Sequence, residues 1–178
     1  AQFPHVALPP PALEGGERFG REALGVEVVL PRELLGEVTG AAHAITLRTS
    51  IIGHELASAH GLLGWFLAQQ GSCRSFDRAV FSGLPTVELA AIIRDVVLPR
   101  PQLQGIYHVA ATPISKHALL QRVAQAYGKS IDLVADSSVV IDRSLVAERF
   151  RADTGYSAPD WDRLVNIMHA SQRLPARV

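Results

Sequence analysis

Two arginines in this sequence have the chemistry to bind phosphate groups. Arg74 and Arg143 each carry a planar guanidinium whose N–H groups match the oxygens of a phosphate or a carboxylate. The alternative is a surface ion pair with a nearby acid, Asp77 or Asp142. Phe76 could stack on a planar base next to Arg74, although packing in a core is the commoner use of a phenylalanine. The residue types alone leave both alternatives open.

Metal binding and thiol chemistry have weaker support. His54, Glu55 and His60 form the pattern His-Glu-x-x-x-x-His, which does not place two imidazoles at i and i+4 on one helix face, so we expect no metal site. Cys73 is the single cysteine, which excludes an intramolecular disulfide and a zinc site of several thiolates. No histidine pattern beside it indicates an activated thiolate, so we expect Cys73 to be inert.

The composition is that of a soluble, globular protein with one sizeable core. The chain has 178 residues, of which 48% are hydrophobic and 19% charged. Lys+Arg and Asp+Glu both number 17, and this balance argues against nucleic acid or an anionic membrane as partner, because both demand an excess of basic charge. No apolar run reaches the length of a membrane span and no secretory signal is visible, so we expect a cytoplasmic protein.

The pattern of elements changes near residue 30. Residues 1–30 are rich in Pro and Gly and predict an irregular segment, whereas residues 31–178 alternate strand-like and helix-like stretches. This alternation predicts an α/β fold. Thr86 is expected to cap the clearest helix and Ser115 the next one. Helices are predicted at 32–42, 61–70, 86–98, 115–128, 144–152 and 160–170, and strands at 44–50, 72–82, 105–110 and 131–135.

Four short motifs stand in an order that carries a family resemblance. They are Leu-Arg-Thr-Ser at 47–50 followed by Gly53, Gly-Leu-Pro-Thr at 83–86, Gly-Ile-Tyr-His-Val-Ala at 105–110, and an Arg, a Ser-Leu and a Pro-Asp-Trp between 143 and 161. In this order and spacing the chain resembles the second half of the dTDP-4-dehydrorhamnose reductases, a branch of the extended short-chain dehydrogenases, over about residues 34–169.

The resemblance implies a fold and a set of binding residues. The expected fold is part of a Rossmann-like parallel sheet with a small helical substrate-binding lobe, made by residues 31–178. The expected function is the sugar-nucleotide side of an NADP(H)-dependent reductase, with a nucleotide-sugar of the dTDP-deoxyhexose type as partner. The residues implied beside the nicotinamide are Thr49, Ser50 and Ile51, and those implied around the substrate are Arg74, Phe76, Gly83, Pro85, Thr86 and Arg143.

Two motifs of such a reductase are absent from this sequence. No Gly-rich turn for a dinucleotide pyrophosphate occurs. The family's Tyr-x-x-x-Lys pair would fall on Val29 and Glu33, which cannot protonate a carbonyl or lower the pKa of a phenol. We therefore predict no catalytic residue and doubt that the chain alone binds NADP.

Two explanations of these absences remain open. One is a truncated or rearranged gene product, which we favour because the first thirty-odd residues look unselected for folding; the other is a diverged binding domain. The alternative function is a non-catalytic binding or self-association module, with a homo-dimer formed through an open sheet edge.

Overall fold

The structure is a computed structural model that describes residues 44–55 and 61–172. The predicted boundary at residue 30 and the predicted helix at 32–42 lie outside these residues. The strands are β1 (Ile45–Arg48), β2 (Ile51–Ile52), β3 (Ser72–Phe76), β4 (Ala79–Phe81), β5 (Leu84–Pro85), β6 (Gly105–His108), β7 (Ile114–Ser115), β8 (Asp132–Asp136) and β9 (Ile141–Asp142). The helices are α3 (Leu62–Ala68), α4 (Thr86–Ile92), the π-helix η1 (Ile93–Val97), α5 (Lys116–Ala126), α6 (Glu148–Thr154) and α7 (Trp161–Ser171).

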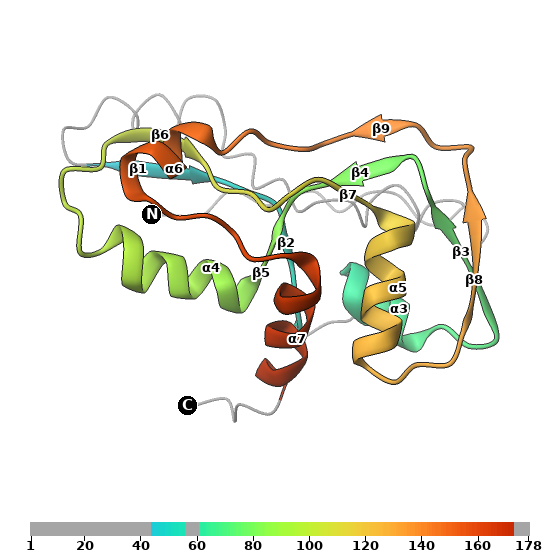
Figure 1. Ribbon diagram of the computed structural model, residues 1–178. Helices are drawn as coiled ribbons and strands as arrows, with labels where there is room; N and C mark the ends of the chain where they lie inside the picture. The colour runs from blue at the N-terminus through green and yellow to red at the C-terminus, as the bar shows by residue number, and fades with distance from the viewer. Residues whose placement is uncertain (1–43, 56–60, 173–178) are drawn as a thin grey trace, which may run out of the picture.

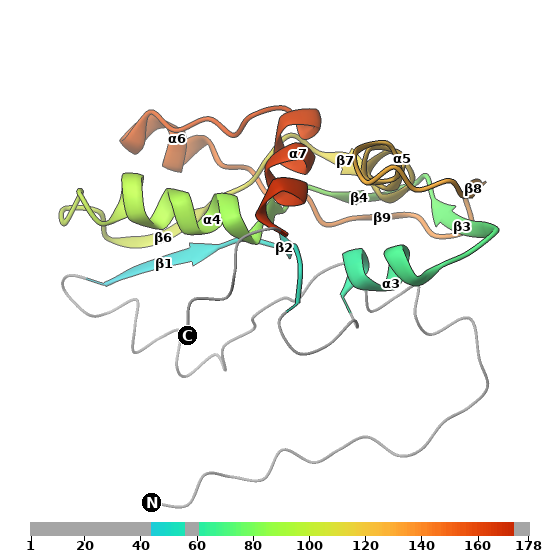
Figure 2. The ribbon, with the colours of Figure 1, turned by 90° about the horizontal axis from the view of Figure 1, so that it is seen from below.

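The strands pair in parallel almost throughout, which confirms the predicted α/β class. β1 pairs with β6, β2 with β5, β3 with β8 and β4 with β9, all in parallel, whereas β4 and β7 are antiparallel. The described elements extend from the β1–β6 pair at one end to the β3–β8 pair at the other (Figure 1). In the view of Figure 2, α5 and α7 lie along one side of the strands and α3 on the opposite side. Parallel strands with helices between them along the chain are typical of Rossmann-like sheets.

Local side-chain chemistry explains where several helices begin and end. Ser115 Oγ accepts a hydrogen bond from the N–H of Ala118 at 3.2 Å, as predicted, and Asp160 caps α7 in the same way through the N–H of Arg163 at 2.8 Å. Gly128, just after α5, has φ +61°, and Gly155, just after α6, has φ +74°, a region that favours glycine.

Two predicted helix starts are wrong. The N-cap of α4 is Pro85 rather than Thr86, which is the first helical residue and makes no capping hydrogen bond. The helix predicted at 144–152 begins only at Glu148, because the preceding residues are held beside β4 by hydrogen bonds from Arg143 to Val80 and from Leu145 to Ser82. Long-range contacts thus override the local helix pattern.

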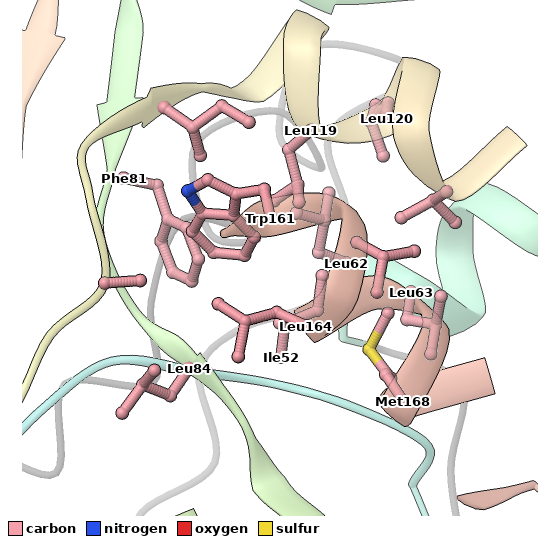
Figure 3. Packing of buried hydrophobic residues seen from close by; sticks show 14 of the residues in the cluster. Ile52, Leu62, Leu63, Phe81, Leu84, Leu119, Leu120, Trp161, Leu164 and Met168 are labelled. Atoms are coloured by element: carbon pink, nitrogen blue, oxygen red, sulfur yellow. The ribbon is translucent and has the colours of Figure 1, made fainter. Parts of the chain in front are cut away.

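The core brings together apolar side chains of α3, α5 and α7, which lie far apart in the sequence. Trp161 of α7 packs its ring 5.9 Å from that of Phe81, and its indole N–H donates to the carbonyl of Thr112 at 2.7 Å. Figure 3 shows Trp161, Leu164 and Met168 of α7 beside the leucines of α3 and α5. The apolar face of α7, the last described helix, therefore covers part of the core. No helix of the described ranges is both long and apolar enough to cross a membrane.

Candidate functional site

The segment after β1 meets the Gly83–Thr86 loop in a parallel strand pair. Ile51 lies opposite Leu84 in register, and the N–H of Leu84 donates to the carbonyl of Ser50 at 2.8 Å. The residues implied for the nicotinamide side (49–51) and three of those implied for the substrate side (Gly83, Pro85 and Thr86) therefore share one junction.

Close backbone approach at this junction requires glycine. A Cβ added to Gly83 would clash with the carbonyl oxygen of Ser50 and with the ring of Phe81. A Cβ added to Gly53 would meet the hydroxyl of Thr86, which is the end of a movable side chain. Gly83 is thus the stricter requirement, because a backbone carbonyl in a strand pair cannot move aside without breaking the pair.

Ser82 joins a third segment to the same loop. It is 1% exposed, its hydroxyl accepts from the N–H of Leu145 at 2.8 Å, and its carbonyl accepts from the N–H of Ala111 at 2.8 Å. The chain just before Leu145 carries Arg143, whose N–H donates to the carbonyl of Val80 at 3.2 Å. The side chain of Arg143 is exposed, and no ion pair or hydrogen bond is recorded for it within the described residues. Its guanidinium is available to an anion.

Arg74 and Phe76 lie on β3, whose strand partner is β8 rather than any strand of the junction. Arg74 pairs with Asp136 at 2.6 Å, which is neither of the acids considered from sequence. Hydrogen bonds from Ser138, together with Arg74, hold the pKa of Asp136 below its usual value. Phe76 is half-buried, and the ammonium of Lys116 lies 5.3 Å from its ring centre.

Lys116, the first residue of α5, is a buried amine that the sequence did not single out. The residue is 1% exposed, and its Nζ lies 4.9 Å from the ring centre of Trp65 as well as near Phe76. Burial lowers the pKa of Lys116. Within residues 44–55 and 61–172 no hydrogen bond of this ammonium is found, and Nζ is not among the fully buried polar atoms that lack a partner. In the structure Lys116 occupies a core position that an apolar residue would normally fill. Nothing in the neighbouring sequence distinguishes it from a lysine on the surface.

Cys73, also on β3, is buried at 5% exposure, and its S–H donates to the carbonyl of Arg74. Burial raises the pKa of the Cys73 thiol, although Lys116 and Lys129 act in the opposite direction. A buried thiol with a raised pKa is a poor nucleophile, which agrees with the inert cysteine that we expected.

His54 follows Gly53 in the chain and contacts Tyr127, the residue after α5. His54 Nε2 and the Tyr127 hydroxyl are 2.9 Å apart, and the ring centre of Tyr127 lies 4.5 Å from that of His169, with the two planes tilted by 51°. Burial, followed by the nearby His169, lowers the pKa of His54, and burial raises that of Tyr127 to about 12. In the described ranges no group of three or more His, Cys, Asp or Glu side chains is arranged to hold a metal ion.

Comparison with solved structures identifies the fold. A dTDP-4-dehydrorhamnose reductase from Bacillus anthracis in complex with NADP superposes with a TM-score of 0.64 at 13% identity, over 74% of this chain and 49% of that one. A dTDP-4-dehydrorhamnose reductase from Clostridium acetobutylicum gives 0.59 at 10% identity, over 74% and 49%. A UDP-N-acetylglucosamine 4-epimerase from Bacillus cereus gives 0.58 at 12% identity, over 74% and 48%.

No family model and no curated protein matches this sequence. The chain spans about half the length of the solved structures named above. At these identities the likeness shows the fold, and it confirms the Rossmann-like architecture that the sequence motifs predicted. The chain therefore carries part of a Rossmann-like fold that it shares with these solved structures.

Proposed function

We propose that this chain is the sugar-nucleotide-binding portion of an NADP(H)-dependent dTDP-4-keto-sugar reductase. The observation that carries the proposal is the junction of Ser50 with Gly83. It lies at the carboxyl end of β1, and ligands of open parallel sheets bind at the carboxyl ends of the strands. The same junction contains the three residues that the resemblance implies beside the nicotinamide and three of the six that it implies around the substrate.

Two side chains near this junction are free to bind the nucleotide. Arg143 offers an unpaired guanidinium for the diphosphate, and the exposed hydroxyl of Thr86 offers both a donor and an acceptor for a sugar. Arg74 is the second guanidinium of the proposed site. Its ion pair with Asp136 is exposed on the arginine side, and exchange of such a partner for a phosphate costs little.

The groups present fit a nicotinamide in part. Thr49, Ser50 and Ile51 are half-buried at a strand end, as residues beside a nicotinamide are expected to be. The sequence holds neither the Gly-rich turn that binds a pyrophosphate nor a Tyr-x-x-x-Lys pair. When bound, NADPH would supply the hydride, and we propose that the residues of this chain contribute substrate binding rather than proton transfer.

Thermal melting of the purified chain tests the proposal. We expect dTDP and dTDP-rhamnose to raise the melting temperature, since a ligand that binds only the folded state stabilises it, and we expect no effect of NADPH. Arg143→Ala should abolish the shift. Arg94→Ala is the matched control, because Arg94 is also exposed and lies on η1, paired with Asp95 at 2.6 Å. Equal shifts in both variants, or no shift in the parent chain, would contradict the proposal.

An alternative is a non-catalytic module that self-associates. The observation in its favour is β8, whose recorded strand partner among the described residues is β3 alone and whose Val134 is 47% exposed. An open strand edge with an exposed apolar residue is a surface for strand addition. Light scattering distinguishes the two functions: a dimer that dissociates in Val134→Lys and ignores dTDP would favour the module.

A further inference from the structure

A separate pocket of about 240 Å³ opens at the carboxyl end of β6. Its first wall is formed by residues 109–112, directly after the strand. Its second wall is the segment from Leu145 to Arg151, which includes the start of α6, and its third is the run 156–158. The carboxyl end of a parallel strand is where open α/β sheets place ligands, so the position itself favours a binding site.

Hydrogen bonds to the junction loop and to α4 fix all three walls. Ser82 accepts from the N–H of Ala111 in the first wall and, through its hydroxyl, from the N–H of Leu145 in the second, both at 2.8 Å. In the third wall the Tyr156 hydroxyl donates to Glu88 of α4 at 2.8 Å. The pocket is thus a fixed feature of the fold, and it adjoins the residue before Gly83.

α6 presents charged groups of two kinds. Arg149 donates to the carbonyl of Ile106 at 3.0 Å, and Asp153 accepts from the Tyr107 hydroxyl at 2.8 Å, so both tie the helix to β6. Glu148 and Arg151 instead line the pocket, and no ion pair or side-chain hydrogen bond is recorded for either among the described residues. The negative charge of Glu148 lies in the first turn of α6 and the positive charge of Arg151 in its last turn, as the helix dipole favours. On the pocket wall Glu148 supplies a hydrogen-bond acceptor and Arg151 several donors.

The wall chemistry selects the class of ligand. Glu148 accepts hydrogen bonds and Arg151 donates them, whereas the hydroxyls of Thr112 and Ser157 do both. The Tyr156 O–H is directed to Glu88, so the lone pairs of its oxygen remain as an acceptor. Neighbouring hydroxyls of a sugar ring each donate and accept, and such a ligand can use every one of these groups. A free amino acid would pair with the two charged groups and offers no array of neighbouring hydroxyls to the rest of the wall.

The volume limits the size of the ligand. Pockets for drug-sized molecules usually exceed about 300 Å³. The smaller volume here favours a ligand of about one sugar ring over a nucleoside diphosphate, and Leu145 and Phe150 add apolar surface to the wall. We propose that the pocket between the end of β6 and α6 binds a single free monosaccharide, separately from the nucleotide-sugar junction.

Saturation-transfer NMR on the full chain tests this with L-rhamnose and D-glucose as probes and glycine as the zwitterionic comparison. We expect transfer to the ring protons of at least one sugar and none to glycine. Arg151→Ala and the size-conserving Glu148→Gln should each weaken the binding about tenfold, the loss of one charge-assisted hydrogen bond. Arg163→Ala is the control, because Arg163 is an exposed arginine on α7 outside the pocket.

Both altered side chains are exposed, so we expect the variants to fold, and their melting curves should match that of the parent chain. Absence of sugar transfer, transfer that both variants leave unchanged, or binding of glycine in place of a sugar would overturn the inference. The proposed nucleotide site is tested with other ligands and with Arg143, so failure of one proposal is distinguishable from failure of the other.

Discussion

Replacement of Lys116 by methionine should stabilise the protein at neutral pH. The methionine keeps most of the length of the buried stem, so the packing against Trp65 and Phe76 is retained, while the charge is removed. Nζ is not among the fully buried polar atoms that lack a partner, so its loss of hydration is partial and costs about 1–3 kcal/mol. The two rings return about 0.5–1 kcal/mol each. We therefore expect Lys116→Met to raise the free energy of unfolding by about 1 kcal/mol at pH 7.

The gain should depend on pH in a defined direction. The pKa of Lys116 is lowered in the folded state, whereas the unfolded chain keeps this proton up to about pH 10.4. Between the two values the unfolded state binds more protons, so the stability of the parent chain rises with pH. In Lys116→Met this rise is absent. The advantage of the variant is therefore largest below the lowered pKa and shrinks as the pH approaches 10.4.

Urea unfolding of both chains at pH 7 and pH 10 measures this difference. Lys116→Ala is the packing control, because the cavity that it leaves should cost about 2–4 kcal/mol at either pH. An advantage of Lys116→Met that grows with pH, or a methionine variant that is less stable than the parent chain at pH 7, would refute the reasoning. It would mean that the aromatic rings favour the ammonium by more than burial disfavours it.

Three further outcomes follow from the junction and the helix ends. In urea unfolding, Gly83→Ala should lower the free energy of unfolding by about 2 kcal/mol, because the added methyl meets a backbone carbonyl. Gly53→Ala should cost less than half as much, because its methyl meets only the movable hydroxyl of Thr86. His54 has a lowered folded pKa, so stability should fall as the pH drops through 6.5, and His54→Gln should flatten that dependence in unfolding curves at pH 5 and 7.5. Asp160→Ala should cost about 1 kcal/mol in the same urea assay through loss of the N-cap; an unchanged midpoint would contradict it.

The sequence predicted the ends of an element correctly where the interactions that fix them join residues close together in the chain. The helix pattern after Ser115 and the stop at Gly128 depend on residues within one turn, and the structure has both. The start of α6 was placed four residues early, because the deciding interaction is the hydroxyl of Ser82, which is 63 residues away from Leu145. A sequence without an alignment carries no signal for such a pair.

The sequence named residues of the candidate site without showing which of them lie together. Residues 49–51 and 83–86 meet through the β2–β5 strand pair, for which the motifs carry no signal. Lys116 was missed because its burial comes from Trp65 on one element and Phe76 on another. A lysine next to a helix N-cap is ordinarily a surface residue, and only tertiary packing reverses that expectation.

Ser82 is the point at which the two proposed sites meet. A buried serine must satisfy its hydroxyl, and this one holds Leu145 with the hydroxyl and Ala111 with the carbonyl. Both partners line the sugar pocket, whereas the next residue, Gly83, packs against Ser50 in the nucleotide junction. A displacement of either pocket wall must therefore move or break a bond to the residue that positions Gly83. Because these bonds are short and Ser82 is buried, the two proposed sites share one rigid support.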